Sequence, residues 1–168
     1  GGTVVSGIIT ATGADINEVS CAIGMDTRIG SKFLNSGPGY GGSCFKKDIL
    51  NLVYLSKFYG LNEVASYWQK VVDLNYWQQH RISKIIVNKL FNNLTSKKIG
   101  ILGFSFKANT NDTRESPAIQ ICKDLIEEGA DLIIYDPKVK ELQIEHDLGL
   151  KQGEKIEEGS WSFSKLVM

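Results

Sequence analysis

The sequence lacks a long apolar run, a surplus of charge of one sign and a basic leader. No stretch reaches the roughly 18 apolar residues of a membrane-spanning helix, so we expect none. Nineteen basic residues balance nineteen acidic ones, so net charge gives no support for nucleic-acid or anionic-membrane binding. Residues 1–15 have no basic segment and do not predict a signal peptide.

Cysteine and histidine are scarce. Cys21, Cys44 and Cys122 are odd in number and far apart, which predicts neither a disulfide framework nor a zinc site. Reduced thiols in the cytoplasm are the simpler interpretation. His80 and His146 have no neighbouring metal ligand, so we interpret both as surface residues and expect no metal.

The first half has the spacing of helices. Residues 1–13 are apolar and end in glycine, as the end of a helix that starts upstream would. Asp15 with an acid three residues later is typical of a capping box. It predicts a helix over residues 16–26, with Cys21 packed beside the apolar face. A second helix is predicted over residues 44–60, ended by glycine.

No glycine or proline interrupts residues 63–91, which predicts one helix capped by Asn62. At about 1.5 Å per residue it would be roughly 43 Å long, more than so short a chain can cover on all sides. Its large aromatic side chains therefore need other helices or a second copy of the chain as cover. These side chains are Tyr67, Trp68, Tyr76 and Trp77.

The second half changes to strand spacing. We predict a strand over residues 99–106, a helix starting at Ser116–Pro117 and a second strand over residues 131–137. Strand, helix and strand in this order form a βαβ unit with parallel strands. In residues 138–168 only "WSFSKLV" suggests a further short strand, so the unit looks incomplete.

The stretch "GPGYGGSCFKKDIL" places four glycines just before Cys44 at a predicted helix start. Glycines let the backbone approach a ligand closely, and a helix N-terminus favours negative charge and hence a nucleophilic thiolate. Lys47 and Asp48 follow on the same helix face, and this set suits covalent catalysis with a carboxylate handling water or protons. The residue types leave a second interpretation open: a tight turn, a structural cysteine and two solvated charges.

The polar loop after the first predicted strand does not have the G-x-G-x-x-G spacing. Lys107 and Arg114 on this loop could contact phosphates at the carboxyl end of the strand. The alternative is that both are exposed cations. Arg28 in "MDTRIG" by itself predicts only a solvent-facing arginine.

These motifs resemble a known family. "GPGYGGSCFKKD" is similar to the active-site loop of the nucleotide-sugar dehydrogenases of the UDP-glucose/GDP-mannose dehydrogenase family. "LNLVYL", "AIGMDTRIGSKFL" and "ILGFSFKANTNDTRESPAI" resemble its UDP-glucose 6-dehydrogenase branch, and four motifs in this order make the resemblance specific. The resemblance runs from about residue 8 to residue 140.

The resemblance implies that residues 1–94 are a mainly α-helical central domain with a long dimerisation helix. Residues 95–168 would be part of a UDP-binding, Rossmann-like α/β domain with a parallel sheet. The implied reaction oxidises UDP-glucose to UDP-glucuronate in two hydride transfers to NAD. Cys44 would form a thiohemiacetal and then a thioester, with Asp48 assisting the water and proton steps. A cytoplasmic homodimer without nucleic-acid or membrane partners is implied as well.

Binding residues also follow from the resemblance. Substrate contacts would come from Arg28 (reaching the neighbouring subunit's substrate), Asn35, Ser36, Gly37, Pro38, Gly39, Tyr40, Gly41, Phe106 and Lys107. Positions near NAD would be Cys44, Phe45, Lys46, Lys47 and Arg114. The family's NAD fingerprint, a catalytic lysine and asparagine, and the final strands with a later substrate arginine have no match in this chain. We therefore expect the isolated chain to be inactive.

The residues leave two alternatives open. The scaffold could be a non-catalytic dimerisation or sugar-nucleotide-binding module. It could also belong to a related GDP-mannose or N-acetylmannosamine dehydrogenase. The combination of Cys44 with Asp48 favours an enzyme, because a pure binder has no use for it.

Overall fold

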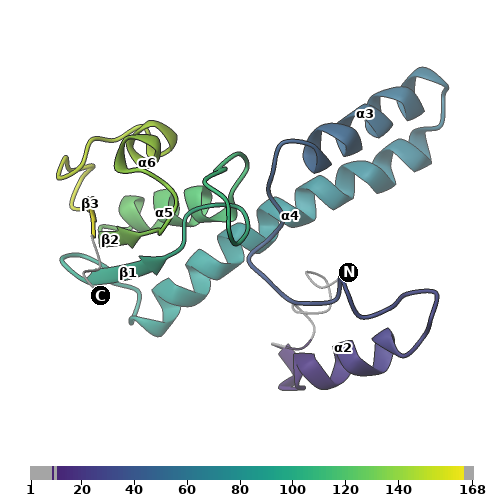
Figure 1. Ribbon diagram of the computed structural model, residues 1–168, viewed down its shortest axis with the longest axis horizontal. Coiled ribbons are helices and arrows are strands. Elements are labelled where there is room, and N and C mark those ends of the chain that lie inside the picture. Colours follow the sequence, from purple (N-terminus) through teal and green to yellow (C-terminus); the bar gives the residue numbers. More distant parts are fainter. Residues whose placement is uncertain (1–8, 10, 165–168) are drawn as a thin grey trace. The chain divides into compact units, whose positions relative to one another are not determined.

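The computed structural model describes residue 9 and residues 11–164 (Figure 1). The chain divides into two compact units, residues 1–39 and residues 40–168. Most of the helix end expected over residues 1–13 lies outside the described residues. The expected domain boundary between residues 94 and 95 stays a prediction. Among the described residues, no helix has the length and hydrophobicity needed to cross a membrane.

The first unit contains helix α2, Ile16–Gly24. Asp15 caps it as predicted, because its carboxylate accepts a hydrogen bond from the Asn17 N–H at 2.7 Å. The Ser20 hydroxyl donates to the Leu34 carbonyl at 3.1 Å and so holds the following loop against the helix. Cys21 is exposed, so the expectation that it packs beside the apolar face was wrong.

The second unit begins with a helical hairpin. Helix α3 runs over Phe45–Phe58 and helix α4 over Asn62–Lys89, and Gly60 at φ +72° makes the turn between them. The prediction of an uninterrupted long helix is confirmed, with Leu61 rather than Asn62 at the cap position. The two helices pack along the hairpin, and α4 continues to pack against α5 of the α/β part (Figure 1).

The α/β part has a three-stranded parallel sheet in the order β1-β2-β3. Its elements alternate along the chain: β1 Lys98–Leu102, α5 Pro117–Glu127, β2 Asp131–Tyr135, α6 Glu141–Leu148 and β3 Ser160–Phe163. The predicted helical half and parallel Rossmann-like unit are therefore confirmed, and "WSFSKLV" does supply the third strand. Helix α6 was not expected from the sequence.

A single apolar core lies between the sheet and its helices. Phe104, Leu132 and Ile134 are almost completely buried in it, as is Trp161 on β3. Side chains from the C-terminal part of α4 pack against this core, namely Ile82, Ile86, Val87 and Leu90. The long helix is therefore a support for both the hairpin and the sheet.

Strand β1 ends at Leu102, four residues before the predicted end at Phe106. The chain turns at Gly103, whose φ is +94°. The next two N–H groups donate to the buried carboxylate of Asp136 instead of to a neighbouring strand. Two further N–H groups, from Lys138 and Val139, donate to the same carboxylate. Burial alone would raise the pKa of Asp136, but these four donors together lower it.

Polar contacts also join the elements at the surface. The imidazole of His80 on α4 lies 2.8 Å from the carboxylate of Asp124 on α5.

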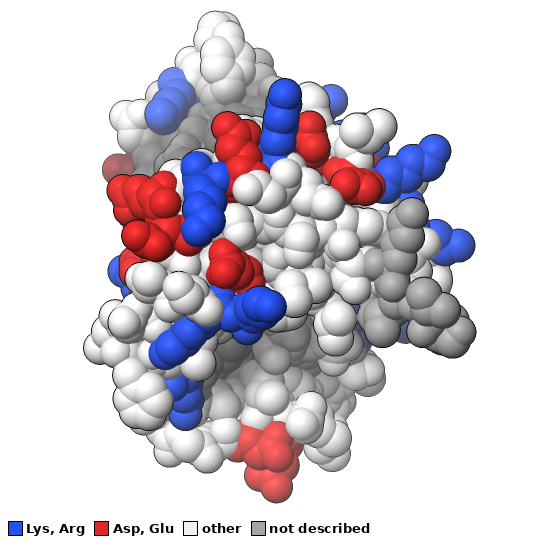
Figure 2. Space-filling view, turned by 90° about the vertical axis from the view of Figure 1, so that its left-hand side faces the viewer, with Lys and Arg blue, Asp and Glu red and all other residues white. Residues whose placement is uncertain are grey.

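On the face drawn in Figure 2, basic and acidic side chains are interspersed around uncharged atoms, in keeping with equal numbers of the two signs in the sequence.

Candidate active site

The second unit begins with a segment that is fixed to α4. In this segment, residues 40–46, which we call the cysteine segment, the Tyr40 N–H donates to the Asn75 side-chain oxygen at 2.8 Å. The Asn75 amide nitrogen donates back to the Tyr40 carbonyl at 3.0 Å. Asn75 is buried, so this reciprocal pair satisfies polar groups that water cannot reach.

The next two residues lie against the loop between β1 and α5, residues 103–116, called the β1–α5 loop here. A Cβ atom at Gly41 would lie 2.4 Å from the Glu115 carbonyl oxygen, which no side chain can accommodate. Gly42 has φ +91°, and its N–H donates to the Arg114 carbonyl at 2.7 Å. The glycines are therefore required by the close approach of two backbones.

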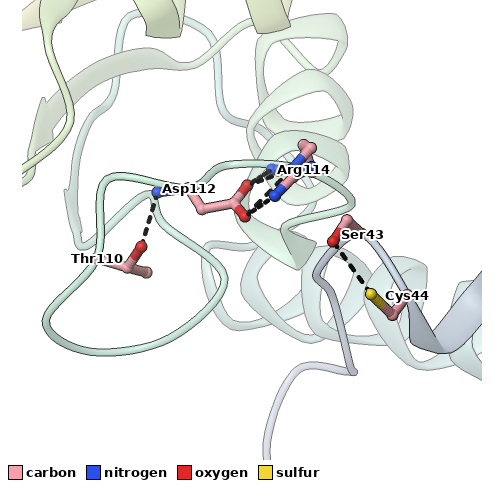
Figure 3. Close-up of polar contacts among 5 residues, drawn as sticks. All are labelled: Ser43, Cys44, Thr110, Asp112 and Arg114. Atoms are coloured by element: carbon pink, nitrogen blue, oxygen red, sulfur yellow. Dashed lines mark hydrogen bonds and ion pairs between the residues drawn. The ribbon is translucent and has the colours of Figure 1, made fainter.

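Cys44 occupies the N-cap position of α3 and is exposed. Its sulfur lies 3.4 Å from the Ser43 hydroxyl (Figure 3). Its carbonyl accepts the Asp48 N–H at 2.9 Å. Lys47 and Asp48 are exposed in the same first turn of the helix, as the spacing predicted. The thiol is thus accessible, while the backbone around it is fixed.

Arg114 is held by Asp112 of its own loop. Its Nη2 lies 2.6 Å from the Asp112 carboxylate, and its backbone N–H donates to the same side chain at 3.0 Å (Figure 3). The pKa of Asp112 is lowered to about 2 by these hydrogen bonds. The pKa of Arg114 is raised, chiefly by Asp112 and in smaller part by the nearby Cys44. A cation is therefore held in a fixed orientation on the loop that contacts the cysteine segment.

The same local arrangement recurs in the first unit. Arg28 lies 2.6 Å from the Asp26 carboxylate, and its backbone N–H donates to that carboxylate at 2.9 Å. Both sites have the sequence Asp-Thr-Arg, in which the acid accepts from the N–H two residues later. This repeated tripeptide is a signal in the sequence that could have predicted two oriented arginines.

Lys46 connects three elements. From the first turn of α3, its ammonium donates to the Tyr76 hydroxyl on α4 and to the Glu115 carboxylate at 2.8 Å. Burial lowers the pKa of Lys46, but these two partners outweigh that effect and raise it. The sequence does not mark Tyr76 or Glu115 as site residues, because they lie far along the chain and belong to no motif around Cys44.

Aromatic side chains line the segment. The Tyr40 and Phe45 rings meet edge to face with centroids 4.6 Å apart. Phe106 packs against Gly42, and the Lys107 ammonium lies 5.2 Å from the centre of the Phe106 ring. Burial is the largest cause of the raised pKa of Tyr40, whose hydroxyl has no hydrogen-bond partner among the described residues.

The structure brings together some of the predicted site residues. Those of the second unit belong to the cysteine segment, the first turn of α3 and the β1–α5 loop that contacts this segment, namely Tyr40, Gly41, Cys44, Phe45, Lys46, Lys47, Asp48, Phe106, Lys107 and Arg114. Arg28 and the loop residues Asn35, Ser36, Gly37, Pro38 and Gly39 belong to the first unit. Their roles stay predictions. The part of the chain that the structure describes has no cluster of three or more metal-binding side chains of the His, Cys, Asp and Glu types.

Comparison with known proteins gives a consistent result. Residues 4–77 match the central domain of the UDP-glucose/GDP-mannose dehydrogenase family, and residues 100–167 match that family's UDP binding domain. UDP-glucose 6-dehydrogenase of Mus musculus is 58% identical over 144 residues, covering 86% of this chain and 29% of the relative. The enzyme of Drosophila melanogaster is 56% identical over 144 residues, covering 86% and 30%. The chain therefore spans about 30% of the length of these relatives.

Solved structures agree. A UDP-glucose dehydrogenase from Pyrobaculum islandicum has a TM-score of 0.76 and 29% identity, over 90% of this chain and 33% of that one. A GDP-mannose dehydrogenase from Pseudomonas aeruginosa has a TM-score of 0.57 and 26% identity, over 98% of this chain and 41% of that one. On the two matched domains and these identities, the chain belongs to the UDP-glucose/GDP-mannose dehydrogenase family.

Proposed function

We propose that this chain forms the central and UDP-binding part of an NAD-dependent UDP-glucose 6-dehydrogenase, which oxidises UDP-glucose to UDP-glucuronate. The observation that carries the proposal is the exposed Cys44 at the start of α3, on a segment whose Gly42 N–H donates to the Arg114 carbonyl. A buried structural cysteine, the alternative from the sequence, would be inaccessible, as Cys122 is. The named relatives favour UDP-glucose as the substrate.

The thiol performs covalent chemistry in this proposal. After the first oxidation, the Cys44 sulfur adds to the aldehyde carbon, and the new oxyanion is protonated to give a thiohemiacetal. Loss of hydride from that carbon, together with loss of the proton from its hydroxyl group, gives a thioester on the same sulfur. Water then adds to the carbonyl carbon, the carbon–sulfur bond breaks and the thiolate returns. The N-terminus of α3 favours the negative charge that develops at these steps, and Asp48 handles the protons of water.

NAD supplies the hydride acceptor for both oxidations when it is bound. Arg114 fits a role in holding it, because one edge of its guanidinium is paired with Asp112 while the side chain stays two-thirds exposed at 67%. A cation fixed in this way suits a phosphate. Phe45, Lys46 and Lys47 are placed near the cofactor by the resemblance.

The UDP-sugar would be held by the predicted substrate residues. Lys107 is exposed beside Phe106, so a cation and an aromatic ring are presented together at the carboxyl end of β1. That end of a parallel sheet is where open α/β folds bind ligands. Residues 35–41 are further proposed substrate contacts, and Arg28 is a proposed contact to substrate bound by the neighbouring subunit.

We also propose that the chain forms a homodimer through α4. Four apolar side chains recur on one helical face and remain exposed: Val64 at 43%, Tyr67 at 66%, Leu74 at 39% and Trp77 at 49%. A two-fold interface would bury them with one self-complementary patch. Light scattering tests this, and a monomer at high micromolar concentration would contradict it.

The cytoplasmic location also belongs to the proposal, supported by three free cysteines. Cell fractionation would test it.

The function is tested by transplanting the chain. In the Drosophila melanogaster enzyme, the aligned segment of 144 residues is replaced by this chain, and NADH formation is followed with UDP-glucose and NAD. We expect activity in the chimera and none with Cys44→Ser. A chimera that binds UDP-glucose without turnover would support the binding-module alternative, and faster turnover of GDP-mannose or UDP-N-acetylmannosamine would change the sugar.

Asp48 has its own test in the same chimera. Asp48→Asn should slow hydrolysis of the thioester more than the first hydride transfer, because the carboxylate is needed to activate water. Rapid quenching followed by mass spectrometry should then trap an acyl group on Cys44. Unchanged turnover would remove Asp48 from the mechanism. The chain by itself should form no NADH.

A further inference from the structure

The cysteine segment is attached to its surroundings at three points. The reciprocal pair at Tyr40 fixes it to α4, and the Gly42 N–H fixes it to the Arg114 carbonyl. Lys46 fixes it a third time, through Glu115 and Tyr76. Cys44 lies midway between the second and third attachments, so its backbone is held on both sides while its side chain stays exposed.

The third attachment is different from the others because it reaches both supports. Tyr76 directly follows Asn75 on α4, and Glu115 directly follows Arg114 on the β1–α5 loop. The Lys46 ammonium touches both, and its side chain is only 23% exposed. The Lys46 ammonium nitrogen also lies over the Tyr76 ring, 5.0 Å from the ring centre. One side chain thus links the start of α3, the long helix and the loop that carries Arg114.

We propose that Lys46 is a positioning residue that holds the Cys44 thiol in place relative to the Arg114 guanidinium. The inference rests on the proposed function, since the thiol and the cation would act on the same bound molecules. The resemblance placed Lys46 near NAD, whereas in the structure its ammonium is bound by two protein side chains. Without it, the two attachments that remain, at Tyr40 and Gly42, both precede Cys44, and the first turn of α3 could pivot away from the loop.

A charge effect and a positioning effect can be separated. Lys46→Met removes the attachment and one positive charge together. Glu115→Ala removes the part of the attachment that reaches the β1–α5 loop. It also leaves the ammonium of Lys46 without its carboxylate partner, so the local potential becomes more positive. An anionic reagent would then react faster with Cys44 if charge alone mattered. It would react more slowly if the position of Arg114 mattered.

The experiment compares alkylation of Cys44 by iodoacetate, an anion, and by iodoacetamide, which is neutral. Exposed Cys21 in the same chain is the internal reference for each reagent, read by mass spectrometry. We expect Lys46→Met and Glu115→Ala each to lower the iodoacetate preference of Cys44 about threefold. Lys46→Arg and the exchange Lys46→Glu with Glu115→Lys should return it to within about twofold of the original.

Lys57→Met is the matched control, because it makes the same substitution at the far end of α3 and should leave the preference unchanged. An increased preference in Glu115→Ala, or no change in Lys46→Met, would overturn the proposal. Circular dichroism establishes that each variant is folded. If Lys46→Met fails to fold, Glu115→Ala and the charge exchange decide the question alone.

Kinetics of the chimera give a second readout. Lys46→Met should lower kcat about tenfold or more, because a small displacement of reacting groups is costly, and should leave the KM for UDP-glucose within about twofold. An inactive parent chimera with the expected alkylation pattern would refute the proposed function and would support the positioning role of Lys46. An active chimera whose alkylation preference is insensitive to Lys46 would refute the positioning role and keep the function.

Discussion

The α/β part and the helical hairpin differ in how far their large aromatic side chains are buried. In the α/β part, Phe104 is 0% exposed, and Leu132 and Trp161 are each 1% exposed. In the hairpin, Phe58 is 69% exposed and Tyr67 66%. Single exposed apolar residues are common on any protein, but those of α4 recur along one face. The α/β part therefore encloses its large apolar side chains in a core that α4 helps to cover, whereas the hairpin leaves a row of apolar side chains exposed along one face of α4.

Removing Trp161 should have the largest effect on stability. It fills the core from β3 and donates its indole N–H to the Leu150 carbonyl at 2.8 Å. We expect Trp161→Ala to lower the free energy of unfolding by about 3–5 kcal/mol, measured by urea denaturation. Leu142→Ala is the control, because that side chain on α6 is 77% exposed. Equal losses in the two variants would contradict the closed core.

Asp136 should come next, because its carboxylate accepts four backbone hydrogen bonds at the ends of β1 and β2. Asp136→Asn replaces one of the two acceptor oxygens by an NH₂ group, which cannot accept these hydrogen bonds. It should lower the free energy of unfolding by about 2–3 kcal/mol. Glu127→Gln on the exposed side of α5 is its control. A loss as small as that of the control would show that the carboxylate is not needed to join the strand ends.

The pH dependence follows from the same residue. Its pKa is lowered in the folded chain: burial opposes this, but the N–H donors prevail. Its stabilisation is therefore fully present above the unfolded value of about 3.9 and is lost as pH falls through the lower folded value. Unfolding measured below about pH 4 should become easier in the parent chain, and this part of the decline should be missing in Asp136→Asn.

Asn75 tests the polar attachment within the hairpin. Asn75→Ala leaves the N–H and carbonyl of Tyr40 without their partner, which should cost about 1–3 kcal/mol. The loss should be accompanied by faster hydrogen exchange at Tyr40 and Gly42, measured by mass spectrometry. If exchange at these amides does not change, the cysteine segment is held by its other contacts alone.

Trp77 should have the smallest effect on the single chain. Because it is 49% exposed, Trp77→Ala should change the free energy of unfolding of the monomer by less than about 0.5 kcal/mol. The dimer dissociation constant should instead rise about tenfold, measured by sedimentation equilibrium or by light scattering over a dilution series. A large loss of monomer stability with unchanged dimerisation would reverse the comparison between the two regions.

Local signals in the sequence predicted most of the elements. The long helix was evident because nothing interrupts it, and α5 was evident from Ser116 followed by proline. Helix α6 was missed because only Ile144 and Leu148 are buried in it. The end of β1 was misplaced because its next N–H groups bind Asp136, about 30 residues later, and no local pattern shows this.

The site was predictable to a similar extent. Cys44 and its helix start follow from neighbouring residues, and the two Asp-Thr-Arg segments could have been read in the same way. The partners of Lys46 could not, because Tyr76 and Glu115 are 30 and 69 residues away and meet it only after the helices have packed. The sequence thus predicts which groups are chemically active, while the attachments that orient them depend on tertiary structure.

The parallel order of the sheet also has a consequence during synthesis on the ribosome. Strand β3 pairs with β2 and supplies Trp161, so the core cannot close until residues 160–163 have been made. At typical elongation rates, about 4–15 s pass between completion of α4 and that moment. During this interval the core against which Ile82 and Ile86 of α4 pack is incomplete on the nascent chain. Chaperones that bind apolar segments should therefore contact the C-terminal part of α4, and crosslinking to stalled nascent chains would detect them.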